Sequence, residues 1–492
     1  MKRAIAALLV ASSLFAHASF AQSESQPQTT PPAPAAPREA KIPQPVERTL
    51  ANGLRVIVIP KHDIPLVASR LTIRTGAAAD PRGKAGVAAL TSTVLTQGTR
   101  THTAEEIARG VEALGATLSA SASWDASAID LSVMSSNLPK AMEFVADVAR
   151  NASFAKQEFD REQAQTIDAL QVEMGQPRSV ASMVTARVLF GDAPYGNNLP
   201  GTPASVTKIR RDDLIAFHRR HYRPNNAVLV LAGDVKPEAA FALAERVFSK
   251  WESAGSASGS GAQPAAAGAK AGAPRVVVID MPEAGQSAVY VGRSGIRRAD
   301  AAYMQALVAN SVLGGGYSSR LNQEIRIKRG LSYGAGSSFD PRATIGPFTA
   351  RTETKHESAA EVAGILTSEL RRLSAADVPA AELTPRKAAL IGEFAQSLET
   401  SRGIVDEVSA LALHGLPLTE INRYISGVQN VTAEQLRQFA SANLAGDANV
   451  VVVGDAKAFE PALRQQFPDV EVIPIAELDL GSPTLRVRKA KQ

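Results

Sequence analysis

At 492 residues the chain is long enough for more than one domain, because domains typically hold about 100–200 residues. It is 45% hydrophobic and 21% charged, which excludes disordered and fibrous proteins, and it lacks cysteine, which excludes disulfide scaffolds, thiol nucleophiles and cysteine-ligated metal sites. The formal net charge is +5 without a long basic run, so nucleic acid is not an expected partner.

The amino terminus has the pattern of an export signal. Residues 1–21 begin with two basic residues, continue with a short apolar run and end in small residues that permit cleavage after Ala18 or Ala21. The apolar run is too short to span a bilayer. Residues 22–45 are rich in Pro, Ser, Gln and Ala, which predicts a disordered tether. We therefore expect a periplasmic protein without a permanent membrane anchor.

The rest of the chain divides into two similar halves. Residues 253–274 consist of Ala, Gly, Ser, Gln and Pro with a single Lys, which predicts a flexible linker between domains at 46–252 and 275–492. Each half contains a helix, then an apolar strand that ends in Gly-Asp (227–234 and 449–455), then another helix. This shared order predicts a duplicated domain.

Within the first half, short strands alternate with pairs of helices. Asn52-Gly53 predicts a turn, and Thr103 with Glu106 predicts a capping box at a helix start. Consecutive strands mixed with helix pairs indicate an α+β class, with an antiparallel-rich sheet packed against helices in each of two tandem homologous domains. Strands are expected at 54–59, 67–74, 117–122 and 126–134, and helices at 86–96, 107–114, 139–150, 156–173 and 179–190.

One segment carries a family resemblance. The stretch from Gly86-Val-Ala to Gly98-Thr99 resembles the zinc-site helix of insulinase/pitrilysin peptidases, in which it reads G-[LV]-A-H-x-x-E-H-x-x-x-x-G-T. Further landmarks of the family are Pro194-Tyr195-Gly196, Leu199–Pro203 and Leu313–Leu321. The resemblance covers most of residues 46–470. It implies two homologous domains of the LuxS/MPP-like metallohydrolase type, with four such domains around a peptide chamber in dimeric members.

The zinc ligands of the family are missing from this sequence. In the family register, Ala89 and Thr93 stand at the two zinc-binding histidines and Ser92 stands at the catalytic glutamate. Residues at i and i+4 share a helix face and can bind one zinc ion, but Ala has no ligand atom and a Thr hydroxyl is a poor ligand. The third ligand falls near Asp168, and one carboxylate does not hold zinc. We expect no metal in this chain.

Other histidines give no convincing replacement. His218 and His221 are close enough to chelate together, but two arginines lie between them, and the segment is interpreted as a solvated basic helix end. His102 lies beside acidic residues that the capping box already explains.

The second half keeps two residues that the resemblance implicates in catalysis. Arg326 and Tyr333 lie seven residues apart at a predicted helix–strand junction, where active family members place an Arg and a Tyr that reach the substrate. Both are hydrogen-bond donors that can stabilise an oxyanion. Alternatively, Arg326 is an ordinary last-turn cation and Tyr333 an ordinary strand aromatic.

A glycine run lies nearby. Gly314, Gly315 and Gly316 separate helices predicted at about 301–313 and 318–328. In processing peptidases a glycine-rich loop at this place contacts the peptide, and the alternative is an unstrained turn.

Three hypotheses follow. In the first, the chain is the zinc-free subunit of a heterodimeric peptidase, with Arg326 and Tyr333 acting on peptide at the zinc of a homologous H-x-x-E-H partner. In the second, it is a catalytically inert scaffold or peptide-binding protein. In the third, it is a lone enzyme that uses Asp168, His218 and His221 as displaced ligands.

Overall fold

The computed structural model describes residues 42–253 and 273–487. The predicted signal peptide (1–21), most of the predicted tether (22–45) and nearly all of the predicted linker (253–274) lie outside the described residues. Among the residues that are described, no helix combines the length and the apolar character that crossing a membrane requires.

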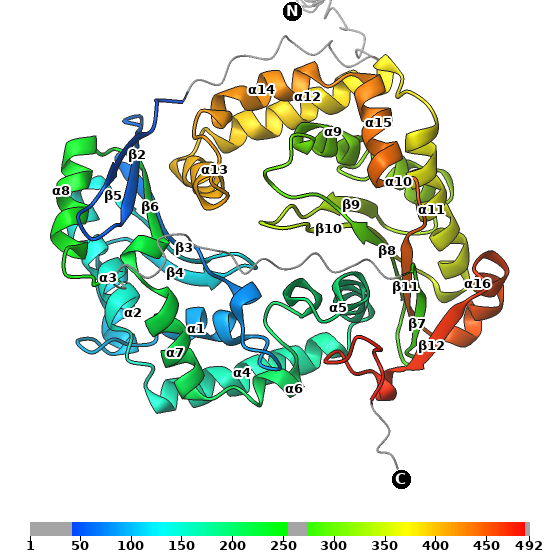
Figure 1. The fold of residues 1–492 in the computed structure, drawn as a ribbon, viewed down its shortest axis with the longest axis horizontal. Coiled ribbons are helices and arrows are strands. Elements are labelled where there is room, and N and C mark those ends of the chain that lie inside the picture. The colour runs from blue at the N-terminus through cyan, green and yellow to red at the C-terminus, as the bar shows by residue number, and fades with distance from the viewer. Residues whose placement is uncertain (1–41, 254–272, 488–492) are drawn as a thin grey trace, which may run out of the picture. The chain divides into compact units, whose positions relative to one another are not determined.

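The first half forms a six-stranded mixed sheet (Figure 1). Its strands follow the order β1-β2-β6-β3-β5-β4; β2 and β6 run parallel, and the other neighbours run antiparallel. The strands are β1 (Val46–Thr49), β2 (Arg55–Pro60), β3 (Leu66–Ile73), β4 (Thr117–Ala122), β5 (Ser127–Met134) and β6 (Ala227–Gly233).

The second half forms another six-stranded mixed sheet, in the order β12-β7-β11-β8-β10-β9. Strand β7 runs parallel to both β11 and β12, and the other neighbours run antiparallel. The strands are β7 (Val276–Asp280), β8 (Ser287–Ser294), β9 (Ala335–Phe339), β10 (Pro347–Thr354), β11 (Asn449–Gly454) and β12 (Val470–Pro474).

Five strands of each sheet correspond in order and direction. The run β2-β6-β3-β5-β4 matches β7-β11-β8-β10-β9, and β1 and β12 are added at equivalent edges from different parts of the chain. The α+β class with two homologous halves is therefore confirmed. In this correspondence the helix that follows β3 is equivalent to the helix that follows β8.

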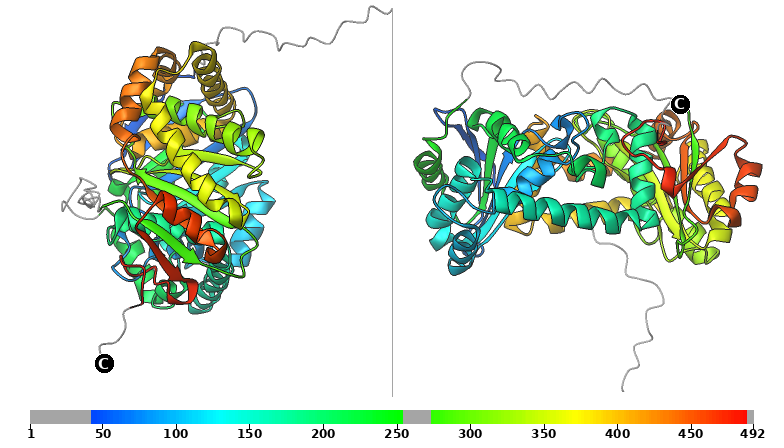
Figure 2. Two further views of the ribbon diagram at one scale, coloured as in Figure 1. Left: turned by 90° about the vertical axis from the view of Figure 1, so that its right-hand side faces the viewer. Right: turned by 90° about the horizontal axis from the view of Figure 1, so that it is seen from below.

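Helices cover both sheets. In Figure 2, α11 lies across the outer face of the second sheet. The helices of the first half are α1 (Val87–Leu95), α2 (Ala104–Ala113), α3 (Leu138–Asn151), α4 (Lys156–Met174), α5 (Pro177–Phe190), α6 (Pro203–Val206), α7 (Arg211–His221) and α8 (Pro237–Phe248). Those of the second half are α9 (Tyr303–Leu313), α10 (Arg320–Asn322), α11 (Ala359–Ala375), α12 (Ala380–Ser397), α13 (Ser401–Leu413), α14 (Glu420–Asn430), α15 (Ala433–Asn443) and α16 (Glu460–Gln466).

One helix from each half packs on the sheet of the other half. Helix α5 packs against β8 and β11, where Val180 and Val184 join a core with Val451 and Val453. Helix α13 packs against β3 and β6, where it contributes to a core with Ile57 and Val230 (Figure 1). Central strands are therefore buried on both faces, which is why β6 is apolar throughout rather than alternating.

A charged network accompanies the α13 contact. Asp130 on β5 lies opposite Arg70 on β3, and the two side chains form an ion pair with a 2.7 Å Nε–Oδ1 separation. From α13, Asp406 pairs with Arg70 at 2.8 Å and Arg402 pairs with Asp130 at 3.3 Å. Only 7% of the Asp130 side chain is exposed, so this carboxylate depends on its two arginines for compensation.

The landmark Tyr195 makes a second contact between the halves. Its hydroxyl group donates to Asp125 Oδ1 at 2.6 Å, and Asp125 Oδ2 accepts from the backbone N–H of Ala343 at 2.9 Å. The guanidinium group of Arg342 lies over the rings of Trp124 and Tyr195, 4.4 and 4.6 Å from their centroids. Burial and the Asp125 hydrogen bond raise the pKa of Tyr195, which keeps its hydroxyl group a donor.

Candidate functional site

Helix α1 occupies the position of the family's zinc-site helix, and its start is held by the chain around it. Gly86 adopts φ +106°, and its N–H and that of Ala88 donate to the carboxylate of Asp80 at 2.7 and 2.8 Å. These bonds satisfy free N–H groups of the first helical turn. Burial raises the pKa of Asp80 to about 7, against the lowering effect of the backbone donors.

The landmark segment 199–203 docks on the same helix start. A Cβ atom on Gly86 would lie 2.6 Å from the carbonyl oxygen of Pro200, and one on Gly201 would lie 2.3 Å from that of Ala85. Ser205 Oγ donates to the Ala85 carbonyl group at 2.8 Å. Gly86 and Gly201 are therefore required by close backbone packing.

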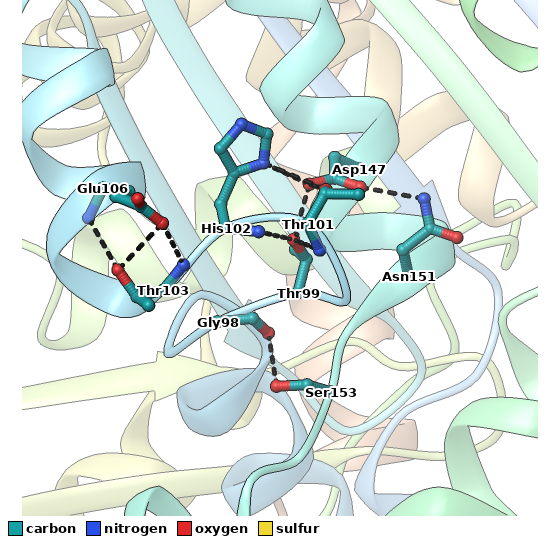
Figure 3. Close-up of polar contacts among 9 residues, drawn as sticks. All are labelled: Gly98, Thr99, Thr101, His102, Thr103, Glu106, Asp147, Asn151 and Ser153. Atoms are coloured by element: carbon teal, nitrogen blue, oxygen red, sulfur yellow. Dashed lines mark hydrogen bonds and ion pairs between the residues drawn. The ribbon is translucent and has the colours of Figure 1, made fainter.

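The segment after α1 is anchored by Thr99 (Figure 3). Its hydroxyl group donates to Asp147 Oδ2 at 2.7 Å, and the same carboxylate oxygen accepts from Thr101 at 3.0 Å and lies 3.0 Å from His102 Nδ1, while Asn151 donates to Oδ1 at 2.8 Å. Burial would raise the pKa of Asp147, but these hydrogen bonds outweigh it and lower the pKa below its usual value. The Gly-Thr part of the motif therefore joins α1 to α3.

The predicted capping box at α2 is confirmed. The N–H of Glu106 donates to Thr103 Oγ1 at 3.2 Å, and the N–H of Thr103 donates to the Glu106 carboxylate at 2.8 Å (Figure 3). These bonds, together with the pairing of His102 and Asp147, give the side chains of Thr103, Glu106 and His102 structural partners.

The residues at the zinc positions of α1 do not fit a zinc ion. Ala89 offers no ligand atom, and the Thr93 hydroxyl group donates to the Ala89 carbonyl oxygen at 3.2 Å. Ser92 is buried in the core-facing side of the helix with 1% exposure. Asp168 lies exposed on α4, which packs against α1. Within residues 42–253 and 273–487, no three His, Asp or Glu side chains are grouped to hold a metal ion.

The interpretation of this segment as a solvated basic helix end holds for Arg219 and Arg220, which are exposed in the last turn of α7, but is wrong for His218 and His221, which are half-buried. His218 is the more enclosed: its Nε2 lies 2.9 Å from the Ala149 carbonyl oxygen, its ring stacks on Tyr222, and Phe154 meets it edge-on. Burial lowers the pKa of both histidines to about 4. The neutral ring of His218 must carry its proton on Nε2 to donate to Ala149. Asp168, His218 and His221 are not brought together.

The burial of His218 predicts an acid sensitivity of the fold. The folded chain keeps this ring neutral down to about pH 4, whereas the unfolded chain takes up a proton below about pH 6.5. The stabilisation is therefore complete above about pH 6.5 and is lost as the pH falls to about 4, a change of about 3 kcal/mol. When urea unfolding is measured across this pH range, the free energy of unfolding should fall less for His218→Gln than for the wild type. Parallel curves would contradict the assignment.

Arg326 lies in a π-helical segment rather than in the predicted α-helix. The α-helix α10 is short and continues as a π-helix over Gln323–Lys328, in which Ile325 is buried and Arg326 is exposed. The Arg326 guanidinium group lies 5.0 Å from the ring centroid of Tyr317. The wider turn changes the direction of the side chains on this segment, and π-helical turns are frequent at functional sites.

Tyr333 is the most exposed of the large hydrophobic side chains among the described residues, at 89%. It precedes β9 rather than lying within it, so the interpretation as an ordinary strand aromatic is wrong. Gly330 at φ +63° ends the π-helical segment, and the N–H of Leu331 donates to the Ile325 carbonyl group at 2.8 Å. This turn holds Arg326 and Tyr333 on one short, exposed junction.

The glycines of the run have different surroundings. A Cβ atom on Gly314 would lie 2.2 Å from the backbone nitrogen of Ser337 on β9, and one on Gly315 would lie 2.9 Å from Ser311 Cα. Gly316 has open space. Packing therefore explains the first two glycines, and it does not explain the third.

Tyr317 was not singled out from the sequence, although its position places it in the candidate site. It is 64% exposed, and its ring lies under Arg326. Its place directly after the glycine run in the Leu313–Leu321 landmark was the available signal.

Comparisons with known proteins give a consistent result. The family model "Insulinase (Peptidase family M16)" matches residues 55–202, and "Peptidase M16 inactive domain" matches residues 208–390. An "uncharacterized zinc protease" of Mycobacterium tuberculosis is 27% identical over 86% of this chain and 95% of the relative. One of Rickettsia bellii is 28% identical over 66% of this chain and 77% of the relative.

Solved structures agree in fold. A peptidase M16 inactive domain from Pseudomonas fluorescens has a TM-score of 0.76 with 26% identity, covering 83% of this chain and 98% of that one. A protease from Helicobacter pylori has a TM-score of 0.75 with 20% identity, covering 84% of this chain and 100% of that one. At that identity the second likeness concerns the fold alone.

Proposed function

Because this chain belongs to the insulinase family of peptidases (peptidase family M16), we propose that it is the zinc-free subunit of a periplasmic heterodimeric peptidase. The observation that carries the proposal is an asymmetry: the zinc positions of α1 hold Ala89, Ser92 and Thr93, while Arg326 and Tyr333 stay exposed at one junction. A homologous partner chain with H-x-x-E-H would hold the zinc ion.

The preserved surroundings of α1 support a retained role for this half. Gly86, Gly201 and Thr99 keep the helix in place although no zinc ligand remains on it. The first half would therefore still offer the surface around α1 to a peptide and to a partner chain.

Arg326 and Tyr333 are suited to act on a substrate held elsewhere. The partner's zinc ion would polarise the peptide carbonyl group and activate a water molecule. The Arg326 guanidinium and Tyr333 hydroxyl groups are donors without a hydrogen-bond partner among the described residues, so they are available to an oxyanion. Tyr317 holds the Arg326 side chain from below.

Reconstitution tests this function. The chain and an H-x-x-E-H homologue encoded beside it would be purified separately and together, and zinc content and peptide cleavage measured for each. Zinc in the homologue alone, with cleavage that requires both chains, is expected. Stoichiometric zinc and activity in the isolated chain would overturn the proposal.

An inert peptide-binding protein is the second candidate, and one observation favours it. Strand β4 forms an edge of the first sheet, and exposed residues alternate along it, so an extended peptide could add to it through backbone hydrogen bonds. Peptide binding by the reconstituted pair without cleavage would select this candidate.

A further inference from the structure

A basic pocket of about 590 Å³ lies on the first half, where three helices end. It is lined by residues at or just beyond the carboxyl ends of α3, α7 and α8. Its five cationic side chains are Arg100, Arg150, Arg219, Arg223 and Lys250. These residues come from separate parts of the chain. In the sequence, only the basic segment His218–His221, which contains Arg219, stands out.

Within the part of the chain that the structure describes, these cations have no carboxylate partner. Among the described residues, none of the five forms an ion pair: Arg150 donates to the backbone carbonyl groups of Val247 and Lys250, and Arg223 reaches that of Glu252 at 3.5 Å.

Helix dipoles account for only part of the charge. Each helix carboxyl end carries about half a negative charge, so three ends and Glu252 together offset roughly half of the five positive charges. A surplus of roughly two to three positive charges remains. Three aromatic side chains of the wall, Phe154, Tyr222 and Trp251, are at most 5% exposed and so are packed against the core.

The backbone also holds this pocket in a strained form. Phe154 adopts φ +46°, a left-handed conformation that a bulky residue rarely takes. Its carbonyl group accepts a hydrogen bond from Arg211, and its ring meets His218. Strain of this kind is retained at binding sites more often than elsewhere.

We infer that this pocket binds a small phosphate anion with at least two negative charges, such as a diphosphate or a short polyphosphate. Guanidinium groups match phosphate oxygens in pairs, and Arg219 and Arg223 supply such groups from the end of α7. Arg100 and Arg223 act electrostatically on His218 in the pocket wall, so a bound anion would act on this ring with the opposite sign.

Titration of the full chain with inorganic pyrophosphate tests the inference. Calorimetry should give one saturable site, and Arg219→Ala should weaken binding about tenfold or more, since it removes a charge-assisted hydrogen bond. Arg220→Ala is the matched control, because it removes the same charge from the same helix turn outside the pocket and should leave affinity within about twofold.

A second readout does not depend on a variant. The pKa of His218, measured by NMR titration, should rise by about one unit when pyrophosphate binds. The reason is that a negative charge nearby favours the protonated ring. Absence of saturable binding, equal effects of the two substitutions, an unchanged His218 titration, or binding of citrate in preference to pyrophosphate would each overturn the inference.

Discussion

Tyr333→Phe is expected to lower kcat of the reconstituted pair about 10²–10³-fold, with binding of the two chains unchanged. The substitution removes one hydroxyl donor from a side chain that is 89% exposed and supports no core packing. Loss of one oxyanion donor has that effect in comparable active sites. Steady-state cleavage of a fluorogenic peptide, with a titration of chain against partner, separates catalysis from association.

Arg326→Ala is expected to act in the same direction, and the chain offers a matched control. Arg329 lies three residues on, is also exposed, and pairs with Glu361 at 3.1 Å. Arg329→Ala removes the same charge from the same segment and should leave cleavage within about twofold, as expected for an exposed ion pair. Equal rates for Tyr333→Phe, Arg326→Ala and the wild type would show that neither side chain contributes to cleavage and would contradict the roles proposed for them.

Asp130→Ala is expected to lower the free energy of unfolding by about 3–5 kcal/mol. The Asp130 side chain is 7% exposed and pairs with both Arg70 and Arg402. Its removal breaks a buried ion pair and leaves Arg70, whose side chain is 20% exposed, paired with the half-exposed Asp406. Arg402 lies on α13, and the loss should therefore also weaken the contact between the two halves. Urea unfolding of the full chain measures the change.

Asp406→Ala is the control for that result. Asp406 pairs with the same two arginines at 2.8 and 3.2 Å, but its side chain is 46% exposed. Exposed ion pairs contribute about 0–1 kcal/mol, so its removal should cost far less than that of Asp130. Equal losses for the two variants would show that burial does not govern this network.

Local sequence patterns predicted most helices and strands near α1. The capping box at Thr103 and the strands expected at 117–122 and 126–134 are formed by short-range hydrogen bonds, and the structure has them within one residue of those positions. The exception in the second half is the predicted helix at 318–328, which is π-helical over Gln323–Lys328. Ile325 in this segment is buried in the core of the second half, a tertiary contact that composition does not report.

The burial of polar side chains was harder to predict from the sequence. The arginines beside His218 suggested solvent, but the ring packs on Phe154 and Tyr222, which come from the loop after α3 and from the end of its own helix. A contact with a residue 64 positions earlier in the chain leaves no periodic mark. The basic pocket could not be predicted for the same reason, since Arg100 and Lys250 are separated by 150 residues.

The sequence by itself determined the class of fold, the duplication and the absence of zinc ligands from α1, because strand and helix periodicity and side-chain donor chemistry are local properties. Only the tertiary structure decided that α5 and α13 cross to the sheet of the other half, that Tyr333 is exposed before β9, and that five cations meet at one pocket. Which surfaces are buried against each other depends on packing between distant segments, and packing is a property of the assembled chain.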